Sequence, residues 1–315
     1  MLVSEPPTLE LVDVNTGQTT RTASVLEGPL STQVGTQRVN VAGRALAVDS
    51  SGNTAYALTT SGLSIIPLDA PVAANRPQVN RDGVVNIASF VPGLAPGSLA
   101  SIFGRNLASA ATADSSPLPT VLGGVCVTLG ARPLPLMMTS PLQINAQIPP
   151  ELAAGRFQMV VRSIEHQIAA ATQQLTLAKY APAVFVDPAS KQAAIFHEDG
   201  RPVNKSAPAN RDQRLVIYAT GLGATKGAKI VSGTPTPAEP LAVTEPVQVF
   251  FGDPNYRESA MQVDWSGLTP GSIGLYQINV YVPWYRMKGE LPVTIRVGGV
   301  ETPKLTPVPP VVVVE

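Results

Sequence analysis

One seven-residue stretch occurs twice in this chain. The segment QINAQIP, which begins at Gln143, returns as QINVYVP at Gln277, 134 positions later. The match continues without a gap through a glycine, an apolar run and an arginine, which is Arg162 in the first copy and Arg296 in the second. A match of this length and spacing indicates an internal duplication.

Each copy alternates apolar and polar residues with a period of two. Ile144 and Ile278 therefore fall on an apolar face, while glutamine and asparagine fall on the opposite face. A proline ends each run, because it cannot donate to a β-ladder, and a glycine-containing turn leads into the next strand. The pattern predicts a half-buried strand that begins a hairpin in each copy.

The composition of the 315 residues favours a folded, all-β protein. Apolar residues make up 44% of the chain, which excludes wholesale disorder. The 31 prolines and 26 glycines favour short strands joined by turns. Only 14% of the residues are charged and the formal net charge is zero, so the chain lacks the positive field that attracts nucleic acid. We expect almost no helix and no nucleic-acid partner.

The sequence shows no membrane span, no export signal at its start and only one cysteine. No run approaches the roughly 20 apolar residues of a membrane span, and the start, MLVSEPPTLELV, lacks the basic and then apolar pattern of an export signal. The single cysteine, Cys126, lies in an apolar alternation, which favours a small buried strand residue over a reactive thiol. We expect no membrane span and no disulfide framework.

Residues 1–76 are predicted to form a blade-like antiparallel sheet and a linker. The turn signals separate five short strands, which are 9–14, 19–25, 45–48, 54–59 and 63–67. Their rhythm resembles a blade of a surface-layer or quinoprotein type of β-propeller. About 70 residues cannot close a propeller, and such a sheet leaves edges and one apolar face unpaired. We therefore expect that a partner covers this part of the chain.

Two immunoglobulin-like β-sandwiches are predicted after the linker, at 77–180 and 181–315. The number of strands before residue 180 suits one such sandwich. The second region repeats the order, because Ile217 in IYATGL lines up with Ile102 in IFGRNL ahead of the repeated segment. The duplication therefore covers strand order as well as the seven-residue stretch.

The repeated amides admit two interpretations. On an exposed strand face they would hydrogen-bond sugar hydroxyls. Amides beside irregular loops more often satisfy the backbone groups of those loops, and a duplication preserves a structural need as readily as a ligand site. We favour the structural interpretation for all four, which are Gln143, Asn145, Gln277 and Asn279.

No pattern predicts a catalytic, cofactor-binding or metal-binding residue. His166 and His197 fall in or beside predicted turns without metal-ligand spacing, which favours solvated turns. The acidic residues Asp253, Glu258 and Asp264 do not repeat the alternating oxygen ligands of a calcium loop. No nucleophile and base are paired in the sequence, so we predict that the chain is not an enzyme.

Aromatic residues gather at one place only. Trp284 and Tyr285 are adjacent, and Tyr276 and Tyr281 lie just before them. Aromatic residues are enriched in contact patches, so this pair is the best candidate for an exposed interaction site. Packing in the core is the alternative.

Five stretches, taken together and in order, resemble a known family. It is the uncharacterised C-terminal domain first catalogued in Solibacter and multiplied in acidobacterial secreted proteins. The resemblance implies an exported protein, with a leader that is not part of this chain, and a tandem immunoglobulin- or IPT/TIG-like tail after repeat domains such as propellers. It implies no assigned activity and no catalytic residue. The stretches are GVVNIASFVPGLAPGSLASIFGRNLA (83–108), PLPTVLGGVCV (117–127), SPLQINAQIP (140–149), RLVIYATGLG (214–223) and GLYQINVYVP (274–283).

The chain ends in an apolar run with two alternatives. It extends the closing strand of its own domain, since the ungapped alignment sets Leu177 opposite Val311. Alternatively, the preceding prolines break the ladder, and the run pairs with an edge of a neighbouring copy by strand addition, head to tail. The residues concerned are Val311, Val312, Val313 and Val314.

These observations favour a non-catalytic extracellular protein with a structural or adhesive role. Head-to-tail self-association into a cell-surface filament is one form of that role. The alternative is a carbohydrate-binding accessory module of a secreted protein, with a glycan as partner. Saturable glycan binding would distinguish the two, because a structural module should show none.

Overall fold

The computed structural model describes residues 8–12, 14–25, 31–34, 37–40, 46–59, 62–68, 76–130, 132–164, 168–170, 173–187, 190 and 192–315. Within these residues the chain is all-β, as predicted, and is built from several antiparallel sheets. The only helical element in this part of the chain is a 3-10 turn, η1 (Arg257–Ser259). None of the described residues belongs to a helix that is long and apolar enough to cross a membrane. We name the three predicted parts the N-terminal unit (1–76), the middle unit (77–180) and the C-terminal unit (181–315).

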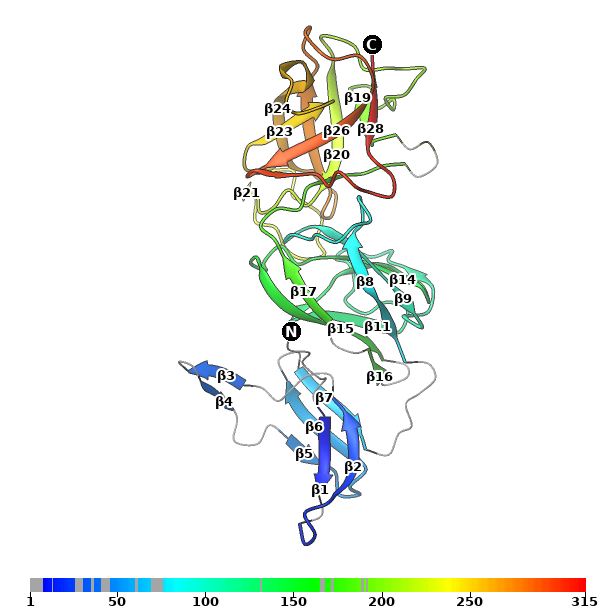
Figure 1. The fold of residues 1–315 in the computed structure, drawn as a ribbon, viewed down its shortest axis with the longest axis vertical. Coiled ribbons are helices and arrows are strands. Elements are labelled where there is room, and N and C mark those ends of the chain that lie inside the picture. Colours follow the sequence, from blue (N-terminus) through cyan, green and yellow to red (C-terminus); the bar gives the residue numbers. More distant parts are fainter. Residues whose placement is uncertain are drawn as a thin grey trace.

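The N-terminal unit forms separate small sheets rather than one blade-like sheet. One is the hairpin β1 (Thr8–Val12) and β2 (Thr19–Ser24), and another is β5 (Leu46–Val48), β6 (Thr54–Thr59) and β7 (Gly62–Pro67). A third hairpin, β3 (Ser31–Val34) and β4 (Gln37–Asn40), was not predicted; Figure 1 shows it to the side of the others. Leu9 and Ala23 of the first hairpin pack on a small cluster around Ala55, Ala57 and Ile66.

The other face of the β5–β7 sheet is apolar and exposed. Tyr56 lies opposite Ile65, and Leu58 lies opposite Leu63, so the four side chains share one surface. All four are exposed, although large apolar side chains in a patch usually mark a contact. The expectation that a partner covers this unit stays a prediction. Most of the predicted linker, residues 69–75, lies outside the described residues.

The middle unit places two sheets on either side of one core. One sheet has the order β10-β13-β14-β9-β8, and the other is β12-β11-β15-β16 with β17 also on β15. Leu94, Ile102, Ile144 and Met159 are among the buried side chains between them. The strands are β8 (Gln78–Asn86), β9 (Leu99–Arg105), β10 (Ala111–Thr112), β11 (Val125–Leu129), β12 (Arg132–Pro133), β13 (Leu136–Thr139), β14 (Gln143–Gln147), β15 (Gly155–Ser163), β16 (Ile168–Ala169) and β17 (Gln173–Leu177).

The C-terminal unit wraps one continuous sheet around its core. The path is β18-β20-β25-β24-β23-β26-β27, with β19 on β20, β28 on β26, and β21 joined through β22 to β24. The sheet is continuous because β24 pairs with both β25 and β23. Its strands are β18 (Ala183–Val184), β19 (Ile195–His197), β20 (Arg214–Thr220), β21 (Lys226–Gly227), β22 (Ala242–Val243), β23 (Val247–Phe251), β24 (Ala260–Leu268), β25 (Tyr276–Tyr281), β26 (Gly289–Val297), β27 (Val300–Glu301) and β28 (Val311–Val314).

The duplication extends from sequence to strand pairing. Ile144 of β14 lies opposite Ile102 of β9, and Ile278 of β25 lies opposite Ile217 of β20. All four are fully buried. The prediction that the two repeated strands occupy corresponding, buried positions is confirmed. The hairpin predicted for each copy is wrong, because β14 pairs with β9 and β13, and β25 with β20 and β24, and neither pairs with the strand that follows it. The immunoglobulin-like topology and the domain boundaries stay predictions.

The C-terminal valines close their own unit. Strand β28 runs antiparallel to β26, with Val314 opposite Gly289, as Leu177 lies opposite Gly155 in the middle unit. The predicted correspondence of Leu177 with Val311 is therefore wrong by three positions. On its other side, β28 makes parallel bridges at Gln192 and Ala209. Strand addition to another copy needs a free strand, and both edges of β28 are occupied, so the structure gives no support to the head-to-tail filament.

The middle and C-terminal units lie end to end (Figure 1) and are joined by hydrogen bonds. The backbone N–H of Leu99 donates to Thr220 Oγ1 at 3.1 Å inside the junction. Gln147 Oε1 accepts from Gly233 N at 2.7 Å, also buried. At the periphery, the Glu151 carboxylate accepts from Ser232 N and Oγ at 2.9 and 2.5 Å. Buried, charge-assisted and backbone bonds of this kind fix orientation, so the two units are held in one arrangement.

We expect this junction to loosen at acidic pH. Burial alone would raise the pKa of Glu151, but the hydrogen bonds from Ser232 outweigh it and lower the pKa. A lowered pKa means that the stabilisation is present above the usual glutamate pKa of about 4.3 and is lost as pH falls through the folded value. Because Glu151 is exposed, the effect should be at most about 1 kcal/mol. Small-angle scattering of the whole chain should show a wider range of particle lengths near pH 3 than at pH 7.

Glu151→Gln should show the wider distribution already at pH 7. Asp199→Asn is the matched control, because Asp199 also has a lowered pKa but is paired with Arg201 inside the C-terminal unit. Identical scattering from Glu151→Gln and from the unaltered chain at pH 7 would show that this contact does not hold the junction.

Candidate functional site

The outer face of β25 carries the second pair of repeated amides. Gln277 and Asn279 are half-buried and alternate with the buried core residues of the same strand. Gln277 Nε2 donates to Asn279 Oδ1 at 2.8 Å. Among the described residues, no partner occupies Gln277 Oε1 or Asn279 Nδ2. An acceptor and a donor group therefore stand side by side on an open strand face.

A β-bulge places Trp265 beside these amides. The register of β24 against β25 shifts between Val263 and Trp265, so Asp264 is the extra residue. Val263 packs against the core. In a regular strand, side chains two positions apart lie on the same face, so Trp265 would face the core as well. The bulge reverses the phase and sets Trp265 opposite Asn279 on the outer face.

The indole of Trp265 lies over Gly267. A Cβ on Gly267 would be 2.5 Å from Trp265 Cζ2 and 2.2 Å from the Ala242 carbonyl oxygen, so no side chain fits there. One side of the half-buried ring therefore packs on the strand backbone. Its Nε1 is buried and has no hydrogen-bond partner among the described residues. A buried donor of this kind normally finds a partner, so Trp265 Nε1 is an exception among the described residues.

Two more aromatic rings flank the amides on the other side. Tyr218 of β20 lies opposite Gln277, and its ring meets Phe196 of β19 edge to face with 5.6 Å between centroids. Tyr218 and Trp265 lie on the two strands that flank β25. These two strands are about 10 Å apart at normal strand spacing. We call Tyr218, Trp265, Gln277 and Asn279 the amide–aromatic face.

The distal end of this face is polar. Tyr281 follows Asn279 on the same side of β25 and donates a hydrogen bond to Asp212, which raises the pKa of the Tyr281 hydroxyl. Arg214 Nε donates to Asp264 Oδ2 at 3.0 Å. Both carboxylates therefore have hydrogen-bond partners, and the three charged groups Asp212, Asp264 and Arg214 leave this end with one net negative charge.

Among the described residues, the hydrogen bonds of the four amides run to each other and to Ser101 and not to a loop backbone. The structural interpretation of the amides stays a prediction. In the middle unit, Gln143 Nε2 donates to Asn145 Oδ1 at 2.8 Å, as in the second copy, and Ser101 Oγ donates to the same oxygen. The amides of each copy bond to each other along one strand. Their remaining polar atoms face outward.

Trp284 is exposed and the adjacent Tyr285 is half-buried, at the end of the C-terminal unit that lies away from the middle unit. The Trp284 side chain is 74% exposed, and its ring meets that of Tyr285 edge to face at 5.7 Å. The guanidinium of Arg257 lies 5.1 Å from the Tyr285 ring centroid. The pair is on the surface and not in the core, and its role in binding stays a prediction.

The other candidate residues are engaged in the fold. His197 is buried in β19, and its Nε2 lies 3.1 Å from the Ala207 carbonyl oxygen, so the prediction of a solvated turn is wrong. Asp253 Oδ1 accepts from Asn255 within its own loop. Cys126 is half-buried in β11, and burial raises the pKa of its thiol. His166 lies outside the described residues.

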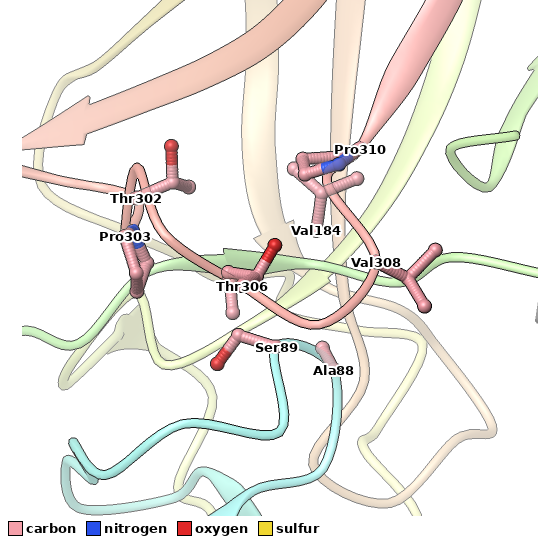
Figure 2. Close-up of a pocket in the computed structure, with 9 residues that line it drawn as sticks. Ala88, Ser89, Val184, Thr302, Pro303, Thr306, Val308 and Pro310 are labelled. Atoms are coloured by element: carbon pink, nitrogen blue, oxygen red, sulfur yellow. The ribbon is translucent and has the colours of Figure 1, made fainter. Parts of the chain in front are cut away.

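No three metal-ligating side chains gather anywhere among the residues that the structure describes. A small cavity lies at the junction, between Ala88 and Ser89 of the middle unit and the loop that contains Thr302 and Thr306 (Figure 2). The volume open to the centre of a water molecule is about 10 Å³, which suits one water. This cavity is too small for a ligand.

Comparisons with known proteins give only distant likenesses. No family model and no curated protein matches the chain. Among solved structures, SGBP-B from a mixed-linkage glucan utilization locus of Bacteroides ovatus, in complex with a mixed-linkage heptasaccharide, is 13% identical with a TM-score of 0.33 and matches over 83% of this chain and 52% of that one. The Escherichia coli adhesin FdeC is 13% identical with a TM-score of 0.21, over 98% and 81%. The γ-CGTase of Alkalophilic bacillus clarkii is 14% identical with a TM-score of 0.25, over 85% and 30%.

This chain spans about half the length of the Bacteroides ovatus protein. TM-scores of 0.33 or less do not carry an argument about function. The residues of the amide–aromatic face are therefore the basis for a function.

Proposed function

We propose that this chain is a non-catalytic, extracellular adhesive protein that binds neutral carbohydrate through the amide–aromatic face. The observation that carries the proposal is the bulge that turns Trp265 outward, beside a donor and an acceptor amide. Bulges recur next to binding and active sites because they re-aim a side chain. Without the bulge, this indole would face the core.

The chemistry of the face suits a sugar. A pyranose ring has an apolar C–H face, which packs on an aromatic ring, and hydroxyl groups, which need both donors and acceptors. Trp265 and Tyr218 supply the rings, and Gln277 and Asn279 supply one acceptor and one donor group between them. At the edge of the face Arg214 pairs with Asp264, and Asp212 leaves one net negative charge, which favours a neutral glycan over an anionic one.

A glycan array followed by isothermal titration tests the proposal. The whole chain should bind at least one neutral oligosaccharide with saturation. Trp265→Ala should weaken that binding about 30-fold, because a central aromatic contact is worth roughly 2 kcal/mol. Trp265→Phe should lose less, because it keeps a ring over Gly267.

Val300→Ala is the matched control, since it removes exposed apolar surface from the same unit at β27. It should bind as the unaltered chain does. Absence of saturable binding to any neutral glycan, or equal affinity of Trp265→Ala and the unaltered chain, would refute the proposal.

A further inference from the structure

We infer that the middle unit carries a second, weaker saccharide site, so that each chain binds carbohydrate at two positions. The inference rests on the proposed function of the C-terminal unit and concerns the other copy of the repeat. Its site is the outer face of β14 and its neighbours, around Gln143 and Asn145.

The two copies share the same hydrogen-bonded amide pair. The bond from glutamine Nε2 to asparagine Oδ1 is 2.8 Å in both. Within the part of the chain that the structure describes, Gln143 Oε1 and Asn145 Nδ2 have no other side-chain or backbone partner. In the middle unit, Ser101 Oγ also donates to Asn145 Oδ1 at 2.8 Å, which fixes the orientation of the amide and keeps its NH₂ group turned outward.

The surroundings of the amides are duplicated as well. Phe103 lies opposite Gln143, in the position that Tyr218 takes opposite Gln277. Phe103 also meets a second ring, that of Phe90, with 6.5 Å between centroids. Phe90 is 43% exposed, so this side of the amides keeps an aromatic surface that a sugar ring can reach.

The bulge recurs at the corresponding position. The register of β13 against β14 shifts between Leu136 and Met138, and Met138 lies opposite Asn145 on the outer face. Met138 therefore takes the place of Trp265. A thioether offers a smaller and more flexible contact than an indole, so the second site should bind the same class of sugar more weakly.

The junction gives the two sites a fixed spacing. Gln147, the last amide of β14, is buried and bonds to Gly233 of the C-terminal unit instead of facing outward. The middle site therefore ends where the C-terminal unit begins. Two sites held at one spacing raise the apparent affinity for a polymer that can reach both, which suits an adhesive protein.

Isothermal titration of the whole chain tests this inference. The probes are soluble neutral hexasaccharides of glucose, mannose, galactose and N-acetylglucosamine, and the tightest of them is used throughout. We expect two sites per chain, the weaker at least about fivefold weaker. The double variant Gln143→Ala/Asn145→Ala should bind one equivalent at unchanged high affinity, and Trp265→Ala should retain the weak site.

Asn145→Asp provides a second variant that keeps the shape of the side chain and removes its NH₂ donor. It should also lose the weak site, and Leu142→Ala, which truncates an exposed neighbour, should keep both. One equivalent in the unaltered chain, weakened by Trp265→Ala and unchanged by Gln143→Ala/Asn145→Ala, would overturn the second site and leave the proposed function intact. Absence of any binding would instead refute the proposed function itself.

Discussion

Replacing Ile278 with alanine is expected to lower the free energy of unfolding of the C-terminal unit by about 2–5 kcal/mol. Ile278 is fully buried and belongs to the core between the strands of this unit. The substitution removes apolar contacts and leaves a cavity that the facing strand, paired through Ile217, can fill only in part. Ile144→Ala should cost the middle unit a similar amount, because Ile144 occupies the corresponding position opposite Ile102.

Urea or thermal unfolding of the whole chain measures this prediction, with one transition assigned to each unit. Gln277→Ala is the matched control, since Gln277 is the neighbour of Ile278 on the outer face of the same strand. It should change stability by less than about 1 kcal/mol. Losses below that value for both isoleucines would show that the repeated strands do not form the centres of two cores.

Periodicity predicted the repeated strands because it reports which side chains share a face. The alternation in each copy placed Ile144 and Ile278 inward, and both are buried. It also placed the amides outward, where they are half-buried. The sequence did not show that the two amides of a strand bond to each other, because side-chain partners depend on rotamers that a pattern does not contain.

The same logic explains why Trp265 was missed. In a regular strand, Trp265 lies on the same face as Met261 and Val263, and an aromatic residue on that face is predicted to be part of the core. The bulge at Asp264 reverses that phase, and the period of two alone does not reveal one extra residue in a strand. Gly267 was the one local signal, since glycine within a strand often marks a bulge or a close approach.

The position of the last strand was also predicted wrongly, because the ungapped alignment counts residues along the chain and takes no account of strand pairing. The ungapped alignment matched Leu177 with Val311, but the loops that lead into β17 and β28 differ in length, and pairing with the corresponding glycines Gly155 and Gly289 matches Leu177 with Val314. The burial of His197 was missed for a different reason. His197 is the last residue of β19, directly before a turn, and its side chain is buried.

The position of β28 makes its deletion the second large effect that we expect. Val312 and Val314 are buried in the core of the C-terminal unit. The backbone N–H groups of Ala193 and Ala209 donate to carbonyl oxygens of the same strand at 2.9 and 2.8 Å. Removing residues 309–315 would expose apolar core and leave these donors without partners, at a combined cost of at least about 4 kcal/mol.

Deletion of residues 309–315 should therefore unfold the C-terminal unit, or lower its melting temperature by tens of degrees, while the middle unit still unfolds separately. Single substitutions show whether the cause is core packing. Val312→Ala and Val314→Ala should each cost about 2 kcal/mol, whereas Val311→Ala and Val313→Ala, on the half-buried side of the same strand, should each cost less than half as much. A strand that merely rests on the surface, or that serves another copy of the chain, would give four equal and small losses and a truncated chain that melts as the full one does. The alternation of large and small effects along four identical residues is the signature of a strand built into its own core.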